Sequence, residues 1–448
     1  MTTGRFFATS FAGIAAALAL LAAAATASAQ SSDDGTHLGV ATCAGDNCHG
    51  AVQRSKGSSV AQDEYRIWSQ KDKHAQAFKM LGGDRGRLIA ANLGLGDPQK
   101  APICLDCHAD NVAPTRRGPR FDIADGVGCE TCHGGAVGWL GLHVSGASHA
   151  ANIAAGMYPT DQPLARAQRC QSCHIGNPDN FVTHRIMGAG HPPMPFELDT
   201  YWAIEPAHDA IDAGYIARKG RPNDIQFWAV GQAIDLEKRM DLIIDPKNAP
   251  HGADPELSLF DCQACHHSMN DLQWRARAST GLGPGRLRLY DASAVMLQVV
   301  AARVAPDAAA ALGSHLLALH RATEAAVPDY WTKVQAEAQQ VRKAADALIP
   351  ILAQHNFDKS DAMALAKALV ASGIDGVDLD YSGAQQQTMA LESVIAGMKS
   401  LGFADDAQIK GLNGALGGLY QVVANDQAYR PDAFAAALRQ LGTKLPQQ

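Results

Sequence analysis

Apolar residues recur at helical spacing in the C-terminal part of this 448-residue chain, after about residue 286. Side chains three and four positions apart share one face of an α-helix, so this spacing predicts helices that each bury one face. The predicted helices cover 292–304, 330–352, 361–369, 389–401 and 409–423. The stretch 371–382 contains Gly and Asp and predicts a connecting loop. These elements predict an antiparallel helical bundle.

The N-terminus carries a different hydrophobic pattern. Arg5 precedes an Ala-rich apolar run over 11–25, and Ala27-Ser28-Ala29 offers a cleavage site. This order is typical of an export signal over residues 1–29. An uncleaved anchor is the alternative, but the run is short for a membrane span of about 20 residues. We predict export to the periplasm and no transmembrane segment in the mature chain. His37, shortly after the signal, is expected to lie in a flexible leader.

All ten cysteines lie between these two regions, in five pairs that are each followed at once by a histidine. Four pairs have the Cys-x-x-Cys-His spacing, which is the attachment signature of c-type haem. Two thiols on one helical face can bind the haem covalently while the next imidazole binds the iron. The motifs are Cys43, Cys48 and His49; Cys104, Cys107 and His108; Cys129, Cys132 and His133; Cys170, Cys173 and His174; and Cys262, Cys265 and His266.

Other uses of paired cysteines explain this pattern less well. Structural zinc needs two such halves per ion and makes no demand on the residue after the second Cys. Disulfides are common in exported proteins, but a bridge has no use for the histidine. The first pair has four intervening residues, and we interpret it as a haem site as well because His49 follows in the same way.

The five motifs lie too close together for each haem to have a domain of its own. We therefore expect closely packed haems that form much of the core, with short helices and long loops around them. The Gly- and Pro-containing stretches 94–102 and 188–195 predict such loops. The predicted fold is mainly α: a signal peptide (1–29), a multihaem c-type cytochrome domain (30–285) and a helical C-terminal domain (286–448).

Several stretches together resemble the multihaem cytochrome c family of the cytochrome c-554 type. They are Trp68 to His74-Ala, the segment 126–134 around the third motif, His184 to His191-Pro with Phe196-Glu197, and Cys265-His266-His267. Cytochromes of that type accept electrons in the periplasm from a hydroxylamine-oxidising enzyme. The resemblance covers about residues 38–290, and it implies that His74, His143, His184 and His191 are the distal iron ligands.

This sequence departs from the family in its number of motifs, which is five instead of four. The fifth distal ligand stays open: the candidates are His149, His208, His251, His267, Met80, Met157, Met194 and an open iron. Related pentahaem nitrite reductases carry Cys-x-x-Cys-Lys at the catalytic iron, and no Cys pair here is followed by Lys.

Composition narrows the function further. A formal net charge of −7 offers no basic surface for nucleic acid. We expect electron transfer through about five covalent haems between periplasmic or membrane-bound redox proteins, and we identify no catalytic residues. The alternative is an oxidoreductase that acts on a small nitrogen or sulfur oxyanion at one five-coordinate haem. In the helical region His315, His320 and His355 are expected at the surface, and the region's role is expected to be structural or in docking.

Overall fold

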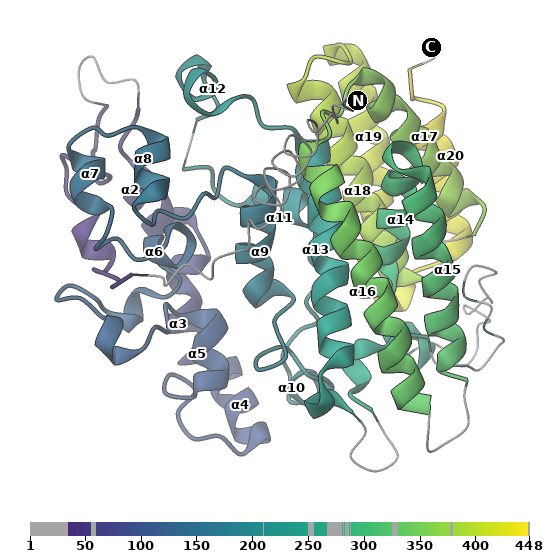
Figure 1. Ribbon diagram of the computed structural model, residues 1–448, viewed down its shortest axis with the longest axis horizontal. Coiled ribbons are helices and arrows are strands. Elements are labelled where there is room, and N and C mark those ends of the chain that lie inside the picture. Colours follow the sequence, from purple (N-terminus) through teal and green to yellow (C-terminus); the bar gives the residue numbers. More distant parts are fainter. Residues whose placement is uncertain are drawn as a thin grey trace, which may run out of the picture.

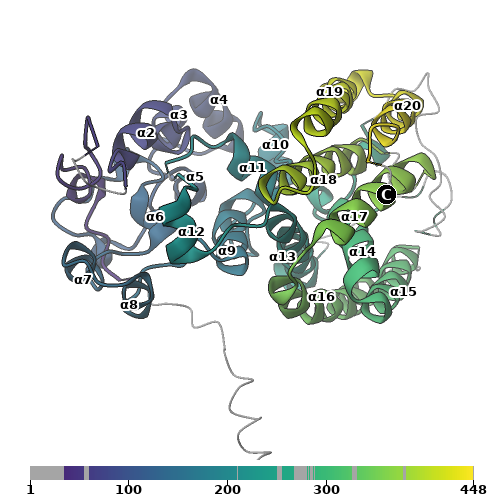
Figure 2. The same ribbon diagram turned by 90° about the horizontal axis from the view of Figure 1, so that it is seen from above.

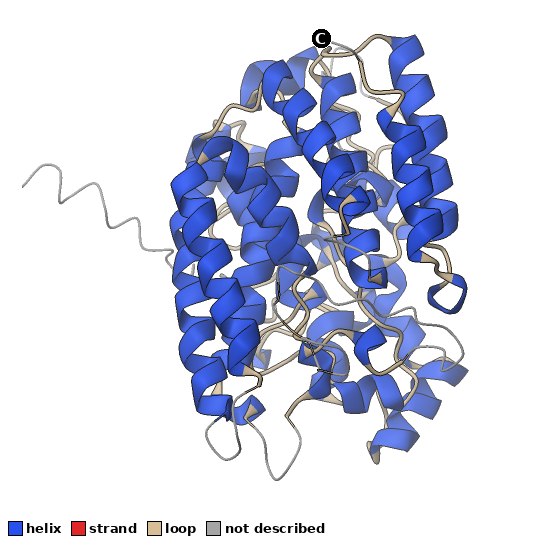
Figure 3. Ribbon diagram, turned by 90° about the vertical axis from the view of Figure 1, so that its right-hand side faces the viewer, coloured by secondary structure: helices blue, strands red, loops and turns tan. Residues whose placement is uncertain are grey.

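The computed structural model describes residues 35–54, 60–208, 210–249, 255–266, 280, 282, 286, 288–324, 330–376 and 380–446. The predicted signal peptide, His251 and His267 lie outside these residues. Helices are the regular elements of the described chain, and its three β-bridges are isolated (Figure 3). This confirms the predicted mainly α fold. None of the helices in the described residues has the length and hydropathy needed to cross a membrane.

The part of the chain with the cysteine motifs is built from short helices and long connections, in purple to teal in Figure 1. Its α-helices are α2 (Glu64–Lys71), α3 (Ala77–Leu81), α4 (Asp84–Leu93), α5 (Pro102–His108), α6 (Cys129–His133), α7 (Leu140–Val144), α8 (His149–Ala154), α9 (Pro163–His174), α10 (His184–Gly188), α11 (Leu198–Ile204) and α12 (Ala213–Lys219). Its 3-10 turns are η1 (Val40–Thr42), η2 (His74–Gln76), η3 (Pro114–Arg116), η4 (Ile123–Asp125), η5 (Pro246–Asn248), η6 (Leu257–Leu259) and η7 (Cys262–Ala264).

The connection between α4 and α5 shows why these helices are short. Gly94 ends α4 in the left-handed conformation, with φ of 71°, which a residue with a side chain rarely adopts. Pro102 then occupies the first turn of α5, where its missing N–H has no partner to lose. The predicted loop 94–102 therefore separates two short helices, and the second of them carries the Cys104 motif.

Long helices form a bundle beside this part of the chain, in teal to yellow in Figures 1 and 2. They are α13 (Asp224–Ile244), α14 (Ala292–Val304), α15 (Pro306–Ala322), α16 (Tyr330–Gln354), α17 (Lys359–Ile374), α18 (Tyr381–Ser400), α19 (Asp406–Val422) and α20 (Pro431–Gly442), with the 3-10 turn η8 (Asp426–Ala428) before α20. Each predicted amphipathic segment lies on one of them, but α17 and α18 extend into the predicted loop 371–382 and leave a shorter connection.

The helix α13 lies inside the bundle although its sequence falls within the range predicted for the multihaem domain. It packs against α16, α14 and α18, and Trp228, Ile234 and Met240 on it are almost fully buried. The same helix packs against α9 and α11, so it joins the bundle to the motif-bearing part (Figure 1). The domain division at residues 285 and 286 stays a prediction.

Two histidines lie elsewhere than expected. His37 is buried, and its Nδ1 lies 2.7 Å from Oδ2 of Asp110, so it is part of the core instead of a flexible leader. His320 is also buried, and its Nδ1 donates to the Leu316 carbonyl oxygen at 2.8 Å. Both predictions were wrong for the same reason: a polar partner at the right distance allows an imidazole to be buried.

Candidate functional site

Three of the five cysteine motifs lie at the C-terminal ends of helices. The helices α5, α6 and α9 each end at the histidine of their motif, His108, His133 and His174. Two cysteines three residues apart share one helical face, and the histidine that follows lies beside them. The Cys262 motif uses the 3-10 turn η7 and the residues just after it.

The first motif, in which four residues separate the two cysteines, folds as a turn instead of a helix. After η1, the backbone N–H of Cys48 donates to the Gly45 carbonyl at 2.8 Å, and that of His49 donates to the Cys43 carbonyl at 3.1 Å. The four intervening residues therefore fold into a loop that returns His49 to Cys43. All ten cysteines lie in the described part of the chain and are free thiols there, so the disulfide alternative is not realised.

Each motif histidine faces a second histidine from a distant part of the chain. The ring centroids of the five pairs lie 5.8 to 6.4 Å apart. Two metal–nitrogen bonds of about 2 Å and the inner halves of two imidazole rings span about 6 Å, so one metal ion fits between each pair. The pairs are His49 with His143, His108 with His191, His133 with His208, His174 with His74, and His266 with His184.

The four histidines predicted as distal ligands are thus all brought opposite a motif histidine. The fifth, His208, was one of several open candidates in the sequence, and it follows α11 in a segment without any motif. His149 lies elsewhere, with its Nε2 3.0 Å from Oδ2 of Asp161. Met80 is 62% exposed at the surface. From the sequence, His208 could be named only as one of several histidines without an assigned role. Its position opposite His133 arises from tertiary packing, which the sequence pattern does not show.

Burial favours the neutral imidazole of the motif histidine at two of the pairs. It lowers the pKa of His133 to about 4, with a smaller electrostatic contribution from the neighbouring His208. Burial likewise lowers the pKa of His174 to about 4, with a further contribution from His74. A neutral imidazole offers a lone pair, which is the form that binds a metal.

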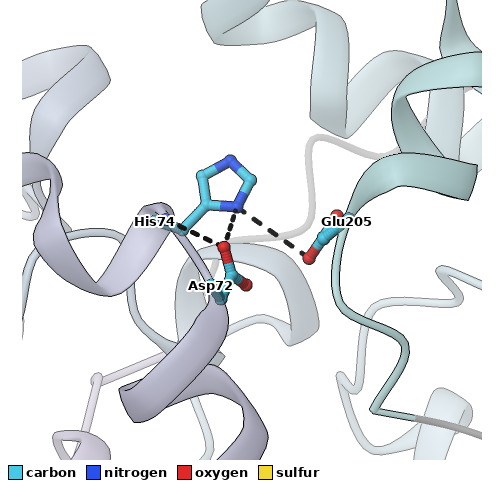
Figure 4. A group of neighbouring side chains, drawn as sticks. All are labelled: Asp72, His74 and Glu205. Carbon is cyan, nitrogen blue, oxygen red and sulfur yellow. Dashed lines mark hydrogen bonds and ion pairs between the residues drawn. The ribbon is translucent and has the colours of Figure 1, made fainter.

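Carboxylates contact the ring nitrogen Nδ1 of two of the paired histidines. Nδ1 of His74 lies 3.0 Å from Oδ1 of Asp72 and 3.9 Å from Oε1 of Glu205. Figure 4 shows the other ring nitrogen of His74 directed away from both carboxylates. The hydrogen bond to Asp72 raises the pKa of His74. In the same way, Nδ1 of His49 lies 2.9 Å from Oε2 of Glu64, which raises the pKa of His49.

Neutral carbonyl groups take this role at the His108 and His191 pair. Nδ1 of His108 lies 3.2 Å from the Ala77 carbonyl oxygen, and Nδ1 of His191 lies 2.8 Å from that of Pro192. A proton on Nδ1 that is donated in this way leaves the lone pair on Nε2. These contacts orient the rings for metal binding through Nε2.

The motifs also lie close to one another. The thiols of Cys43 and Cys129 interact, and a hydrogen bond between them lowers the pKa of Cys43 and raises that of Cys129. The Sγ of Cys107 lies 4.0 Å from the Cys173 carbonyl oxygen, and the Sγ of Cys173 lies 3.6 Å from that of Asp106. The first motif therefore lies beside the third, and the second beside the fourth.

Free thiols, motif histidines and opposed imidazoles are the groups that a covalently bound haem with two histidine ligands needs. Residues 42–134, which contain the first three motifs, match the family model of cytochrome c554 and c-prime. This match confirms the predicted resemblance, and it supports a c-type cytochrome with covalently bound haem that takes part in electron transfer. Comparisons with curated proteins and with solved structures find no match.

Proposed function

We propose that this protein is a periplasmic multihaem c-type cytochrome that carries five covalently bound haems and transfers electrons between redox partners. One observation carries the proposal: each of the five motif histidines faces a second histidine at 5.8 to 6.4 Å between ring centroids. The two cysteines of each motif would hold the haem covalently, and the two histidines would bind its iron from opposite faces.

The residues of this chain fit the haem in three respects. The thiols are free, the imidazole pairs have room for a metal, and hydrogen bonds at Nδ1 leave Nε2 available on four of the histidines. Haem with two histidine ligands supplies one-electron exchange, whereas the protein sets its potential through ligands, hydrogen bonds and burial.

Five distal histidines favour a carrier over the alternative oxidoreductase. A reaction on a small oxyanion needs an iron with an open position, and the proposal assigns His208 to the position that the sequence left open. The proposed periplasmic location rests on the signal sequence, whose residues lie outside the described part.

Two measurements test the proposal. The mass of the purified, unfolded protein should exceed that of the processed chain by five haems, and a mass that corresponds to four would contradict the proposed number. The visible spectrum of the reduced protein should not change on addition of carbon monoxide, because all irons have two firm ligands. A change corresponding to one haem in five would instead support the oxidoreductase.

A further inference from the structure

We propose that the carboxylates of Asp72 and Glu64 act as positioning residues that lower the reduction potentials of the haems at the His74–His174 and His49–His143 pairs. This inference rests on the proposed function and adds to it which two of the five haems have their potentials lowered by a carboxylate of this chain. It concerns the carboxylate contacts of Nδ1 of His74 and of Nδ1 of His49.

Asp72 is fixed in place by its own contacts. It caps the C-terminus of α2, where its backbone N–H donates to the Trp68 carbonyl at 3.1 Å, and it is 5% exposed. Its Oδ1 accepts from the backbone N–H of His74 at 2.8 Å and lies 3.0 Å from Nδ1 of the same residue. The carboxylate therefore holds both the backbone and the ring of His74, as Figure 4 shows.

Glu205 approaches the same place from another element. It follows the C-terminus of α11, and its Oε1 lies 3.9 Å from Nδ1 of His74. Asp72, His74 and Glu205 have the ligand types of a small metal site. We assign them to the haem because the ring centroid of His74 lies 6.2 Å from that of His174, which belongs to a cysteine motif.

Glu64 makes the equivalent contact at the first motif. It lies in the first turn of α2, and its Oε2 is 2.9 Å from Nδ1 of His49. One helix thus supplies the carboxylate for His49 at its start and the carboxylate for His74 at its end. The helix α2 therefore connects the two sites.

The remaining pairs differ in their Nδ1 partners. His108 and His191 face neutral carbonyl oxygens. Among the described hydrogen bonds and ion pairs, none joins a carboxylate to a ring nitrogen of the His133–His208 or His184–His266 pair. An anion that accepts the Nδ1 proton increases electron donation through the imidazole. The ferric iron carries one more positive charge than the ferrous iron, so this donation stabilises the ferric form and lowers the potential.

The experiment is a potentiometric titration of the holoprotein, followed by electron paramagnetic resonance at each potential. The His74 and His174 rings are nearly perpendicular, at 89°, whereas the His49 and His143 rings are nearly parallel, at 15°. Perpendicular ligand planes leave two iron d orbitals close in energy and give a more anisotropic signal than parallel planes. The two haems should therefore be distinguishable in one sample.

We expect Asp72→Asn to raise the midpoint of one highly anisotropic signal, and Glu64→Gln to raise that of a near-parallel signal. Each should change the ferric-to-ferrous ratio at fixed potential by about tenfold, which corresponds to about 59 mV for one electron. The amide oxygen that Asp72→Asn introduces can still accept from the backbone N–H of His74. The matched control is Asp161→Asn, which removes a carboxylate from His149, a histidine that faces no motif, and should leave all five midpoints unchanged.

Unchanged midpoints in either folded variant that retains five low-spin haems would overturn the inference and leave the proposed function standing. The His74→Ala variant tests the proposed function itself. If every haem in this variant stays low-spin and does not bind carbon monoxide, the proposed function is contradicted. If Asp72→Asn does not fold, Glu64→Gln tests the same effect at His49.

Discussion

Single residues decide the chemistry of this protein, and His208 is the clearest case. It is one of 17 histidines in the chain, and no motif surrounds it. Its ring centroid lies 6.4 Å from that of His133, whose cysteines are on α6. A residue with an ordinary sequence context thus completes the fifth pair.

Replacing His208 by alanine should open the proposed haem at His133. We expect His208→Ala to convert one haem in five to a high-spin form that binds carbon monoxide, while the other four stay unchanged. His149→Ala is the matched control and should show no new binding, because His149 contacts Asp161 instead of a motif histidine. Absorption spectra with and without carbon monoxide measure both variants. A His208→Ala protein that remains closed to carbon monoxide would remove His208 from the ligand set.

At the scale of elements, the ends of helices explain much of the local order. Asp358 caps α17 and forms a capping box with Asp361. Asp361 also accepts from Arg303 on α14 at 2.7 Å, and its Oδ2 lies 2.7 Å from Nε2 of His355 after α16. One carboxylate therefore links three helices of the bundle.

Removing this carboxylate should destabilise the bundle in a pH-dependent way. Burial alone would raise the pKa of Asp361, but hydrogen bonds from His355, Arg303 and the Asp358 backbone outweigh it and lower the pKa. Its contribution is therefore complete above the unfolded pKa of about 4 and is lost as the pH falls through the lower folded value. We expect Asp361→Asn to cost about 1 to 2 kcal/mol at pH 7.

Urea denaturation followed by circular dichroism measures this cost at each pH. The difference between Asp361→Asn and the unchanged protein should shrink as the pH falls below about 4. Asp406→Asn, in the first turn of α19, is a control without these contacts to other helices. An equal cost for Asp361→Asn at pH 7 and at the lowest pH at which both proteins fold would contradict the argument.

At the scale of the whole molecule, α13 connects the motif-bearing part to the bundle. It packs against α9 on one side and against α16, α14 and α18 on others. A buried ion pair makes a second connection: Arg288, before α14, donates to Asp261 and Asp380 at 2.8 Å each. Asp261 immediately precedes Cys262, so the fifth motif is attached to the bundle.

A fragment that omits α13 should not fold. Residues 286–448 alone would expose the surface that Trp228, Ile234 and Met240 cover in the full chain, so we expect aggregation or a loss of cooperative unfolding. A fragment of residues 222–448, which includes α13, should be more soluble and should unfold more cooperatively. Thermal unfolding followed by circular dichroism compares them, and equal behaviour would show that α13 is dispensable to the bundle.

The arrangement of the five pairs predicts two classes of low-spin signal in the oxidised protein. The ring planes are nearly perpendicular in three pairs, at 86° to 89°, and closer to parallel in two, at 15° and 33°. We expect electron paramagnetic resonance to show highly anisotropic and ordinary rhombic signals in a ratio of three to two. A single class would contradict these ring orientations.

Some features of this protein could be predicted from local sequence. Covalent attachment requires two thiols and a histidine at short spacing, so the cysteine motifs are visible in the sequence. Helices with one buried face show a periodic pattern, and α14, α16 and α19 lie close to the predicted segments. α13 was not predicted as part of the bundle because its sequence lies between the Cys170 and Cys262 motifs, within the range predicted for the multihaem domain.

The sequence by itself therefore determined the haem motifs, the mainly α fold and four of the proposed distal histidines through a resemblance. Only the tertiary structure decided that His208 faces His133, that Asp72 and Glu64 hold Nδ1 of His74 and His49, and that α13 belongs to the bundle core. The physical reason is the range of the interactions. Thioether attachment and helical periodicity act over a few residues, whereas opposed imidazoles, their carboxylate partners and a fully buried helix depend on packing between distant segments.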